Sequence, residues 1–206
     1  MKVRETKIDG AFVITPDVHF DSRGYFTETF NQEDFNKIIP DVIFVQDNQS
    51  HSAKNVLRGL HFQKGEFAQA KLVRCTEGIV YDVAVDLRPW SKTYMQWEGV
   101  TLSDVAFNQF YIPRGCAHGF VVISDAATFQ YKCDNLYHPE AEGGVNPFDP
   151  QFDIDWKISP EEAIMSEKDK VRDNYKKIEM FKTDDLRDDN GNNYFSEKYL
   201  LAKYFK

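Results

Sequence analysis

Short apolar and aromatic runs separated by turn residues fill the first two thirds of the chain. Between Gly10 and Cys133, segments rich in Val, Ile, Phe, Tyr and Thr alternate with Gly, Pro, Asn, Asp and Ser. This spacing is typical of many short β-strands. Because no long helical pattern lies between the runs, we expect an antiparallel sandwich or barrel. The expected strands are residues 11–15, 25–30, 42–46, 56–62, 71–76, 79–87, 94–102, 109–112, 119–123 and 128–133.

Two segments carry helix signals. Residues 31–39 have Asn31 at the N-cap position, acidic residues in the first turn and apolar residues on one side. Ser159 followed by Pro160 is typical of a helix start. The charged tail from Lys168 onward is expected to be helical or loosely packed. No linker is visible, so we expect a single domain over residues 1–206, with a β core at about 8–135 and a C-terminal loop and helical segment at about 140–206.

The charge balance restricts the partners of the chain. There are 25 Lys and Arg against 33 Asp and Glu, which gives a formal net charge of −8. Nucleic acid and anionic membrane surfaces are therefore repelled, and an anionic ligand must be bound by local clusters of cations. No apolar run approaches the roughly 18 residues of a membrane span, and the first residues lead into no apolar signal core. We expect a cytoplasmic protein that binds neither nucleic acid nor membrane.

Three cysteines are present, and we expect them to be small buried residues. Cys75, Cys116 and Cys133 are odd in number, widely spaced and without a CxxC pair. This pattern argues against a disulfide framework and against a structural zinc site.

Two histidines stand in distinctive surroundings. His61 lies in the apolar strand of residues 57–63, where strict alternation places it on one face with Gly59 and Gln63. A glycine at that place lets a ligand or another backbone approach closely, which favours a functional role for His61. His118 follows a Pro-x-Gly-x-x-His string and, taken alone, is as often structural as functional.

Eight motifs in one order carry a family resemblance. They are Asp21–Glu28, Gln46–Asn48, Leu57–His61, Lys71–Val73, Asp82–Arg88, Ile112–Phe120, Tyr131–Tyr137 and Ser166–Asp169. From about residue 8 to residue 170 the chain resembles the dTDP-4-dehydrorhamnose 3,5-epimerase family. The resemblance implies an all-β, cupin-like antiparallel jelly roll, here with a short inserted helix and a C-terminal helical appendix, that forms a homodimer and binds no metal. Cys116 departs from the family pattern, which more often has an aromatic residue there.

The residues also bear on whether a metal is bound. Metal-binding cupins bring two histidines and a carboxylate from the first motif and another histidine from the second. Gln63 stands where the second histidine of the first motif would fall. His61 and His118 alone are too few for a stable transition-metal site. We therefore expect no metal and no other cofactor.

The reaction that the resemblance implies is inversion at C3 and C5 of a 4-keto-6-deoxyhexose carried on a nucleoside diphosphate. Each inversion needs a base, a group that stabilises the enolate oxygen and an acid on the opposite ring face. The resemblance assigns these roles to His61, Lys71 and Tyr131, in that order. It also gives Asp169 the role of orienting the imidazole, and Asp82 is a second candidate for this role.

Further positions match family residues that bind the substrate. Arg23, Arg58 and Lys168 match positions that bind the nucleotide and its diphosphate, and an arginine fork suits phosphate. The other matched positions are Phe26, Glu28, Gln46, Asp47, Asn48, His118 and Glu142. In the family the Arg23–Glu28 segment reaches across to the neighbouring subunit.

Arg58 is three residues from His61, so ideal alternation places the two on opposite faces of the strand. Both can serve one site only if the strand bulges near Gly59 or the site wraps around its edge.

Three other functions stay open. One is an epimerase of another nucleotide-linked 4-keto sugar, or of one carbon only. The second is a cupin that binds a sugar without chemistry. The third is a metal-dependent dioxygenase, which Gln63 disfavours. The joint presence of His61, Lys71, Tyr131 and an acidic partner favours the enzyme, because a binding module needs no base and acid on opposite faces of its ligand.

Overall fold

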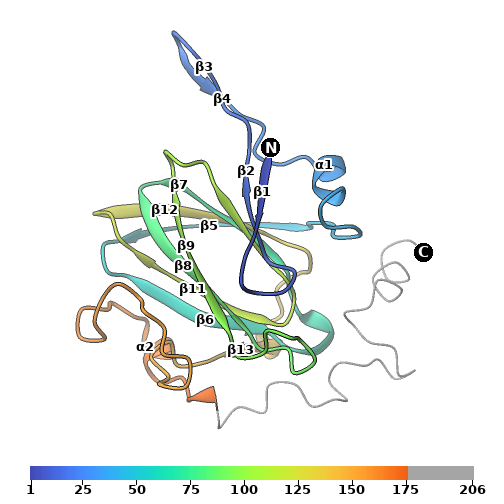
Figure 1. Cartoon of the computed structure of the whole chain (residues 1–206). Coiled ribbons are helices and arrows are strands. Elements are labelled where there is room, and N and C mark those ends of the chain that lie inside the picture. The colour runs from blue at the N-terminus through green and yellow to red at the C-terminus, as the bar shows by residue number, and fades with distance from the viewer. Residues whose placement is uncertain (176–206) are drawn as a thin grey trace.

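Two antiparallel β-sheets lie face to face and form the body of the protein (Figure 1). The computed structural model describes residues 1–175. One sheet has the order β1-β2-β10-β7-β12-β5 and the other has the order β13-β6-β11-β8-β9. The first contains β1 (Lys2–Glu5), β2 (Phe12–Thr15), β10 (Gln109–Ile112), β7 (Lys71–Glu77), β12 (Ala126–Cys133) and β5 (Gln46–Ala53). The second contains β13 (Glu142–Gly144), β6 (Leu57–Gln63), β11 (Cys116–Val122), β8 (Ile79–Asp86) and β9 (Trp97–Ser103). The expectation of an all-β antiparallel jelly roll is confirmed.

Three apolar clusters hold the sheets together. The inner core fills the space between the sheets and includes Phe110, Phe129 and Phe120. One outer core, with Trp156 and Leu60, lies where the segment after β13 covers the five-stranded sheet. The other lies under α1 (Gln32–Asn36) on the outer face of the six-stranded sheet. Each sheet is therefore covered on both faces over much of its area, and polar side chains that point inward need partners.

Most expected strands are present, but β5 lies later in the chain than expected. The sequence indicates a strand at 42–46, whereas β5 covers Gln46–Ala53 and pairs with β12 along its full length. The segment is polar because β5 is an edge strand, with buried or half-buried residues alternating with exposed ones. A search for hydrophobic runs alone therefore does not find β5. The short strands β1 and β13 were not expected either.

A two-stranded hairpin projects from one end of the sandwich (Figure 1). It consists of β3 (His19–Asp21) and β4 (Gly24–Phe26). The expected strand at 25–30 is wrong beyond Phe26, because the following segment runs over pockets on the outer face of the six-stranded sheet. Three aromatic side chains of the hairpin are exposed, namely Phe20, Tyr25 and Phe26.

The inserted helix forms as predicted, although it ends earlier. In α1 the side chain of Asn31 accepts hydrogen bonds from the backbone N–H groups of Glu33 and Asp34, which makes Asn31 the N-cap. Phe35 is the buried residue of the helix and packs against Phe44 and Tyr111. The helix thereby closes one outer core.

The helix expected at Ser159 is wrong. The backbone N–H of Ser159 is bound by the Glu162 carboxylate, and the chain forms only a turn there. Ile164 is then drawn into a parallel bridge with Val56, in which its backbone bonds to Asn55 and Leu57. The helix α2 (Glu167–Lys170) starts after this bridge, with Ser166 as N-cap. Two 3-10 turns, Gly65–Phe67 and Pro139–Ala141, complete the described elements. The tail at 176–206, expected to be helical or loosely packed, lies outside the described residues.

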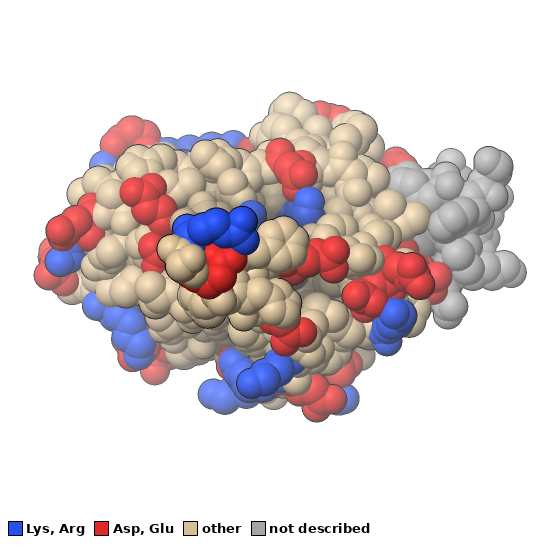
Figure 2. All heavy atoms as spheres, turned by 90° about the horizontal axis from the view of Figure 1, so that it is seen from above, with Lys and Arg blue, Asp and Glu red and all other residues tan. Residues whose placement is uncertain are grey.

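None of the helices formed by residues 1–175 has the length and apolar character needed to cross a membrane. The face from which the hairpin projects carries acidic and basic side chains side by side (Figure 2). Positive and negative side chains are therefore interspersed on this face.

A one-residue register shift in β6 determines which side chains face the inner space. His61 pairs with His118 of β11, but Arg58 pairs with Phe120, so the ladder shifts between these pairs. Gly59 has φ of 135°, and a Cβ there would lie 2.6 Å from the Cα of Gly119. Only glycine allows the two backbones to approach this closely. The bulge that Arg58 and His61 require in order to share a face is therefore present.

We predict that Gly59→Ala lowers the free energy of unfolding more than Gly24→Ala does, by about 1–3 kcal/mol, the usual cost of overpacking. Gly24 is a matched control because its φ is 134° and no atom lies within 4 Å of a Cβ built there. Denaturant unfolding of both variants measures the difference. Equal losses would show that the close approach to Gly119 does not matter for stability.

Candidate active site

His61 and Asp169 form a hydrogen-bonded pair between the β-sandwich and the segment that follows it. The imidazole Nε2 lies 2.6 Å from the Asp169 Oδ1. β6 carries the histidine, and α2 holds the aspartate, whose backbone N–H donates to the Ser166 side chain. The Asp169 carboxylate is buried, while 35% of the His61 side chain is exposed. The imidazole is therefore held by a buried carboxylate at one nitrogen, while another part of the ring is accessible to solvent.

The charge state of Asp169 settles the tautomer of His61. Burial acts to raise the pKa of Asp169, but the hydrogen bond and charge of His61, with the Ser166 bond and the Arg172 cation, outweigh it and lower that pKa. An ionised carboxylate can only accept hydrogen bonds. Nε2 therefore donates its proton to Asp169, and in the neutral imidazole the lone pair lies on Nδ1.

Arg58 shares the inner face of β6 with His61. Leu57, Leu60 and Phe62 pack in the outer core, so the shift at Gly59 turns Arg58 and His61 to the opposite side. The Arg58 Nε donates to the Ser52 Oγ at 3.1 Å. Its positive charge acts on Tyr131 in the facing sheet.

Lys71 and Tyr131 face the inner space from neighbouring strands of the six-stranded sheet. Lys71 is opposite Cys133 in the β7–β12 ladder, and its Nζ lies 5.6 Å from the centre of the Tyr131 ring. Burial lowers the pKa of Lys71 and raises the pKa of Tyr131. The six-stranded sheet thus places an amine and a phenol opposite the sheet that carries His61.

His118 and Asp82 form a second pair, fully within the inner space. The His118 Nε2 lies 2.8 Å from the Asp82 Oδ2. Burial lowers the pKa of His118 and raises the pKa of Asp82, which favours the neutral form of each. The two candidates for orienting His61 are thereby separated, because Asp169 bonds to His61 whereas Asp82 bonds to His118. His118 pairs with His61 in the β11–β6 ladder, and the charge of Lys71 also acts on it.

Glu142 gathers cations at the edge of the five-stranded sheet. Its Oε1 lies 2.5 Å from the Lys168 Nζ and 2.7 Å from the Arg172 Nη2, and its Oε2 accepts from the Tyr137 hydroxyl. Burial acts to raise the pKa of Glu142, but these hydrogen bonds lower it to about 2. Glu142 is paired with Gln63 in the ladder, two residues from His61. Lys168 and Glu142 therefore lie close to the histidine, at the edge of the site.

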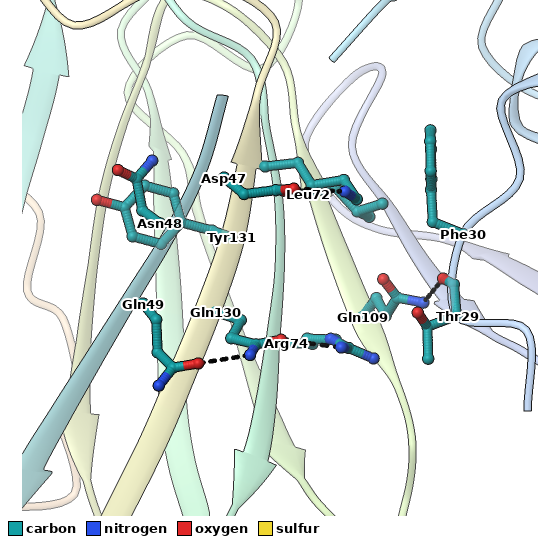
Figure 3. Close-up of a pocket in the computed structure, with 11 residues that line it drawn as sticks. Thr29, Phe30, Asp47, Asn48, Gln49, Leu72, Arg74, Gln109, Gln130 and Tyr131 are labelled. Atoms are coloured by element: carbon teal, nitrogen blue, oxygen red, sulfur yellow. Dashed lines mark hydrogen bonds and ion pairs between the residues drawn. The ribbon is translucent and has the colours of Figure 1, made fainter. Parts of the chain in front are cut away.

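The motif Gln46–Asn48 is divided between two faces of β5. Gln46 bonds to Asn48, which reaches the Cys133 thiol on the inner side. Asp47 points to the outer face, where it binds Lys132 in a pocket of about 310 Å³ that Phe30 also lines (Figure 3). Asp47 is therefore not brought together with His61 within one chain.

Arg23, Phe26 and Glu28 are also distant from the other predicted residues. Arg23 is 88% exposed and binds only the neighbouring Asp21 among the described residues. Phe26 and Glu28 are exposed on and after the projecting hairpin. The single chain does not bring this segment to His61.

Gln63, at the place of a possible metal ligand, is buried and its side chain accepts a hydrogen bond from the backbone of His138. Within residues 1–175, no three His, Cys, Asp or Glu side chains are grouped closely enough to hold a metal ion.

One residue near the site, Arg172, was not found from the sequence, whereas Tyr137 belongs to the Tyr131–Tyr137 motif but is not among the predicted site residues. Arg172 contacts both Glu142 and Asp169, and Tyr137 bonds to Glu142. No pattern marks Arg172, because its partners are 30 and 3 residues away and only the packing of α2 brings them together.

Comparison with known proteins agrees with this geometry. Residues 5–177 match the family model described as dTDP-4-dehydrorhamnose 3,5-epimerase. The chain belongs to this family. A relative of that name from Escherichia coli is 54% identical over 157 residues, which cover 76% of this chain and 85% of the relative.

Solved structures of the family have the same fold. The epimerase of this name from Elizabethkingia anophelis is similar with a TM-score of 0.83 at 49% identity, over 88% of this chain and 99% of that one. A dTDP-6-deoxy-D-glucose-3,5-epimerase from Legionella pneumophila, solved in complex with dTDP-4-keto-L-rhamnose, has a TM-score of 0.81 at 44% identity, over 84% and 92% of the two chains. The cupin-like jelly roll implied by the sequence is confirmed.

We predict that Glu142→Gln destabilises the protein above about pH 5 and that the difference from the parent vanishes as the pH falls to about 2. The lowered pKa of Glu142 means that its ionised form stabilises the fold above the unfolded-state value and that this contribution is lost through the folded-state value of about 2. Denaturant unfolding of both proteins at several pH values measures it. A difference that does not depend on pH would contradict the role of the Glu142 charge.

Proposed function

We propose that the protein is an isomerase that inverts C3 and C5 of dTDP-4-dehydro-6-deoxy-D-glucose to give dTDP-4-dehydro-L-rhamnose. The observation that carries the proposal is that His61 of the five-stranded sheet, bonded to Asp169 of α2, lies opposite the inner face of the six-stranded sheet, which carries Lys71 and Tyr131. The family membership and the sugar nucleotide bound by the Legionella pneumophila relative support this substrate.

Each inversion consists of two proton transfers at a carbon next to the 4-keto group. The free Nδ1 of His61 takes the proton, and the C–H electron pair becomes part of an enolate. The Lys71 ammonium stabilises the enolate oxygen where water is partly excluded. Tyr131 gives its hydroxyl proton to the same carbon from the opposite face. His61 then returns its proton to solvent, and Tyr131 takes one up.

The cations at the edge of the site suit a nucleoside diphosphate. Arg58 lies on the inner face of β6, and Lys168 is 60% exposed beside Glu142. Arg58 can approach phosphate oxygens through its fork and Lys168 as a point charge. Gln46 and Asn48, which line the inner side of β5, offer amide groups to the base and sugar.

We also propose a homodimer in which the β3–β4 hairpin of one subunit reaches the site of the other. Phe20 is 72% exposed and Phe26 is 70% exposed, and such projecting apolar side chains mark interaction surfaces. Arg23, Phe26 and Glu28 would then contact the neighbour's nucleotide. A cytoplasmic location stays a prediction, with which the buried free thiols of Cys75, Cys116 and Cys133 agree.

Incubation with dTDP-4-keto-6-deoxyglucose in deuterated water tests the reaction. Deuterium at both C3 and C5 supports double epimerisation, and deuterium at one carbon selects an epimerase of that carbon only. If none of several nucleotide-linked 4-keto sugars exchanges hydrogen, the chain is a sugar-binding module and the proposal is wrong.

We predict that His61→Ala lowers kcat by at least about 100-fold, the lower part of the range that a positioned general base supplies. His51→Ala is the matched control, because His51 is exposed on β5 and bonds only to Thr128 and Glu77 among the described residues. Steady-state kinetics of both variants measure the two kcat values. Near-normal turnover of His61→Ala would remove His61 from the role of base.

We predict that Tyr131→Phe abolishes inversion but keeps hydrogen exchange with solvent at the substrate carbons. His61 can still remove a proton and return one to the same face, whereas the acid on the opposite face is lost. Deuterium incorporation and product configuration, both read by NMR, separate the two events. Tyr81→Phe, which removes a hydroxyl from the outer core, is the control. Retained inversion by Tyr131→Phe would assign the acid to another group.

A further inference from the structure

Arg172 is held in place by the segment that follows α2. The backbone of Asp173 accepts from Asn146, and the Asn174 side chain bonds to the same asparagine. The Tyr175 backbone N–H donates to Asp149, and its ring packs against Phe152. These contacts fix the chain on both sides of the Arg172 backbone, between α2 and residue 175.

The Arg172 side chain lies over Gly144, beside His61 in the sheet. Gly144 pairs with His61 in the β13–β6 ladder, and a Cβ on Gly144 would lie 2.6 Å from the Arg172 Nε. The glycine therefore leaves the space that the guanidinium occupies. Only 16% of the Arg172 side chain is exposed.

The guanidinium touches two carboxylates with different atoms. Its Nη2 lies 2.7 Å from the Glu142 Oε1, whereas its Nε lies 3.9 Å from the Asp169 Oδ1, the oxygen that His61 binds. The Nε is buried and has no hydrogen-bond partner among the described residues. Toward Asp169 the arginine thus acts by its charge, and Glu142 holds it in position.

We propose that Arg172 is a positioning residue for the epimerase reaction, which keeps Asp169 ionised and aimed at His61 and so maintains the His61 tautomer with a free Nδ1. The inference rests on the proposed function, but its physical core is the Arg172–Asp169–His61 contact, which exists without substrate. A buried carboxylate is stable as an anion only with compensating hydrogen bonds or cations, and the Arg172 charge adds to the hydrogen bonds that Asp169 receives from His61 and Ser166. Arg172 supplies its charge from the interior side, whereas Lys168 binds Glu142 at the exposed edge, where a diphosphate can approach it.

The test compares Arg172→Gln, which removes the charge, with Arg172→Lys, which keeps it. Kinetics with dTDP-4-keto-6-deoxyglucose give kcat and KM, and NMR of ¹⁵N-histidine-labelled protein without substrate gives the tautomer of His61, assigned with His61→Ala. We expect Arg172→Gln to lose about tenfold or more in kcat, since small misplacements of reacting groups have effects of this size. KM should change by less than about twofold. The His61 signals should shift from a single Nε2–H tautomer to a mixture, and Arg172→Lys should restore both readouts.

Lys170→Gln is the control, because it also removes one positive charge, two residues before Arg172 at the end of α2, from an exposed side chain that binds only Glu167 among the described residues. Wild-type kcat in Arg172→Gln, or a fall in kcat with unchanged His61 signals, would overturn the inference. So would an Arg172→Lys protein that folds but loses both readouts, which is the decisive variant if Arg172→Gln does not fold. An inactive wild-type protein would instead defeat the proposed function, while the NMR comparison would still test Arg172.

Discussion

The close approach of Gly59 and Gly119 determines how β6 presents its side chains. A strand with strict alternation places residues three apart on opposite faces. The bulge at this contact shifts the ladder by one residue, so the strand can bury Leu57 and Leu60 on one side and turn Arg58 and His61 to the other. Without it, Arg58, the proposed cation for the diphosphate, and His61, the proposed base, would lie on different sides of the sheet.

Carboxyl groups lie next to the basic side chains of the site. His61 and Lys71 are half-buried, and a carboxyl group lies near each of them: Asp169 bonds to His61, and Asp82, bonded to His118, lies near Lys71. A chain with net charge −8 can thus bind an anion, because its acidic groups at the site are bound to their own partners.

The ordered motifs predicted the fold, the family and the residues that the two sheets bring together, because His61, Lys71 and Tyr131 each lie within one strand whose periodicity is local. The rest depended on packing between distant segments. Edge strand β5 is polar, and the Ser159 segment has a good helix start that the Ile164 bridge to Val56 overrides. The partner of each histidine could not be chosen from spacing, and Asp47 faces the outer side although its neighbours face the inner one.

His61 and Asp169 are separated by 108 positions along the chain, and the second of them comes after the whole sandwich. During synthesis the strands can pair and the inner core can close before Asp169 leaves the ribosome. The newly made sandwich then holds an imidazole without its carboxylate partner until the segment with Asp169 docks. Under the proposed mechanism, competence for turnover is therefore a late event for each molecule, separate from the collapse of its core.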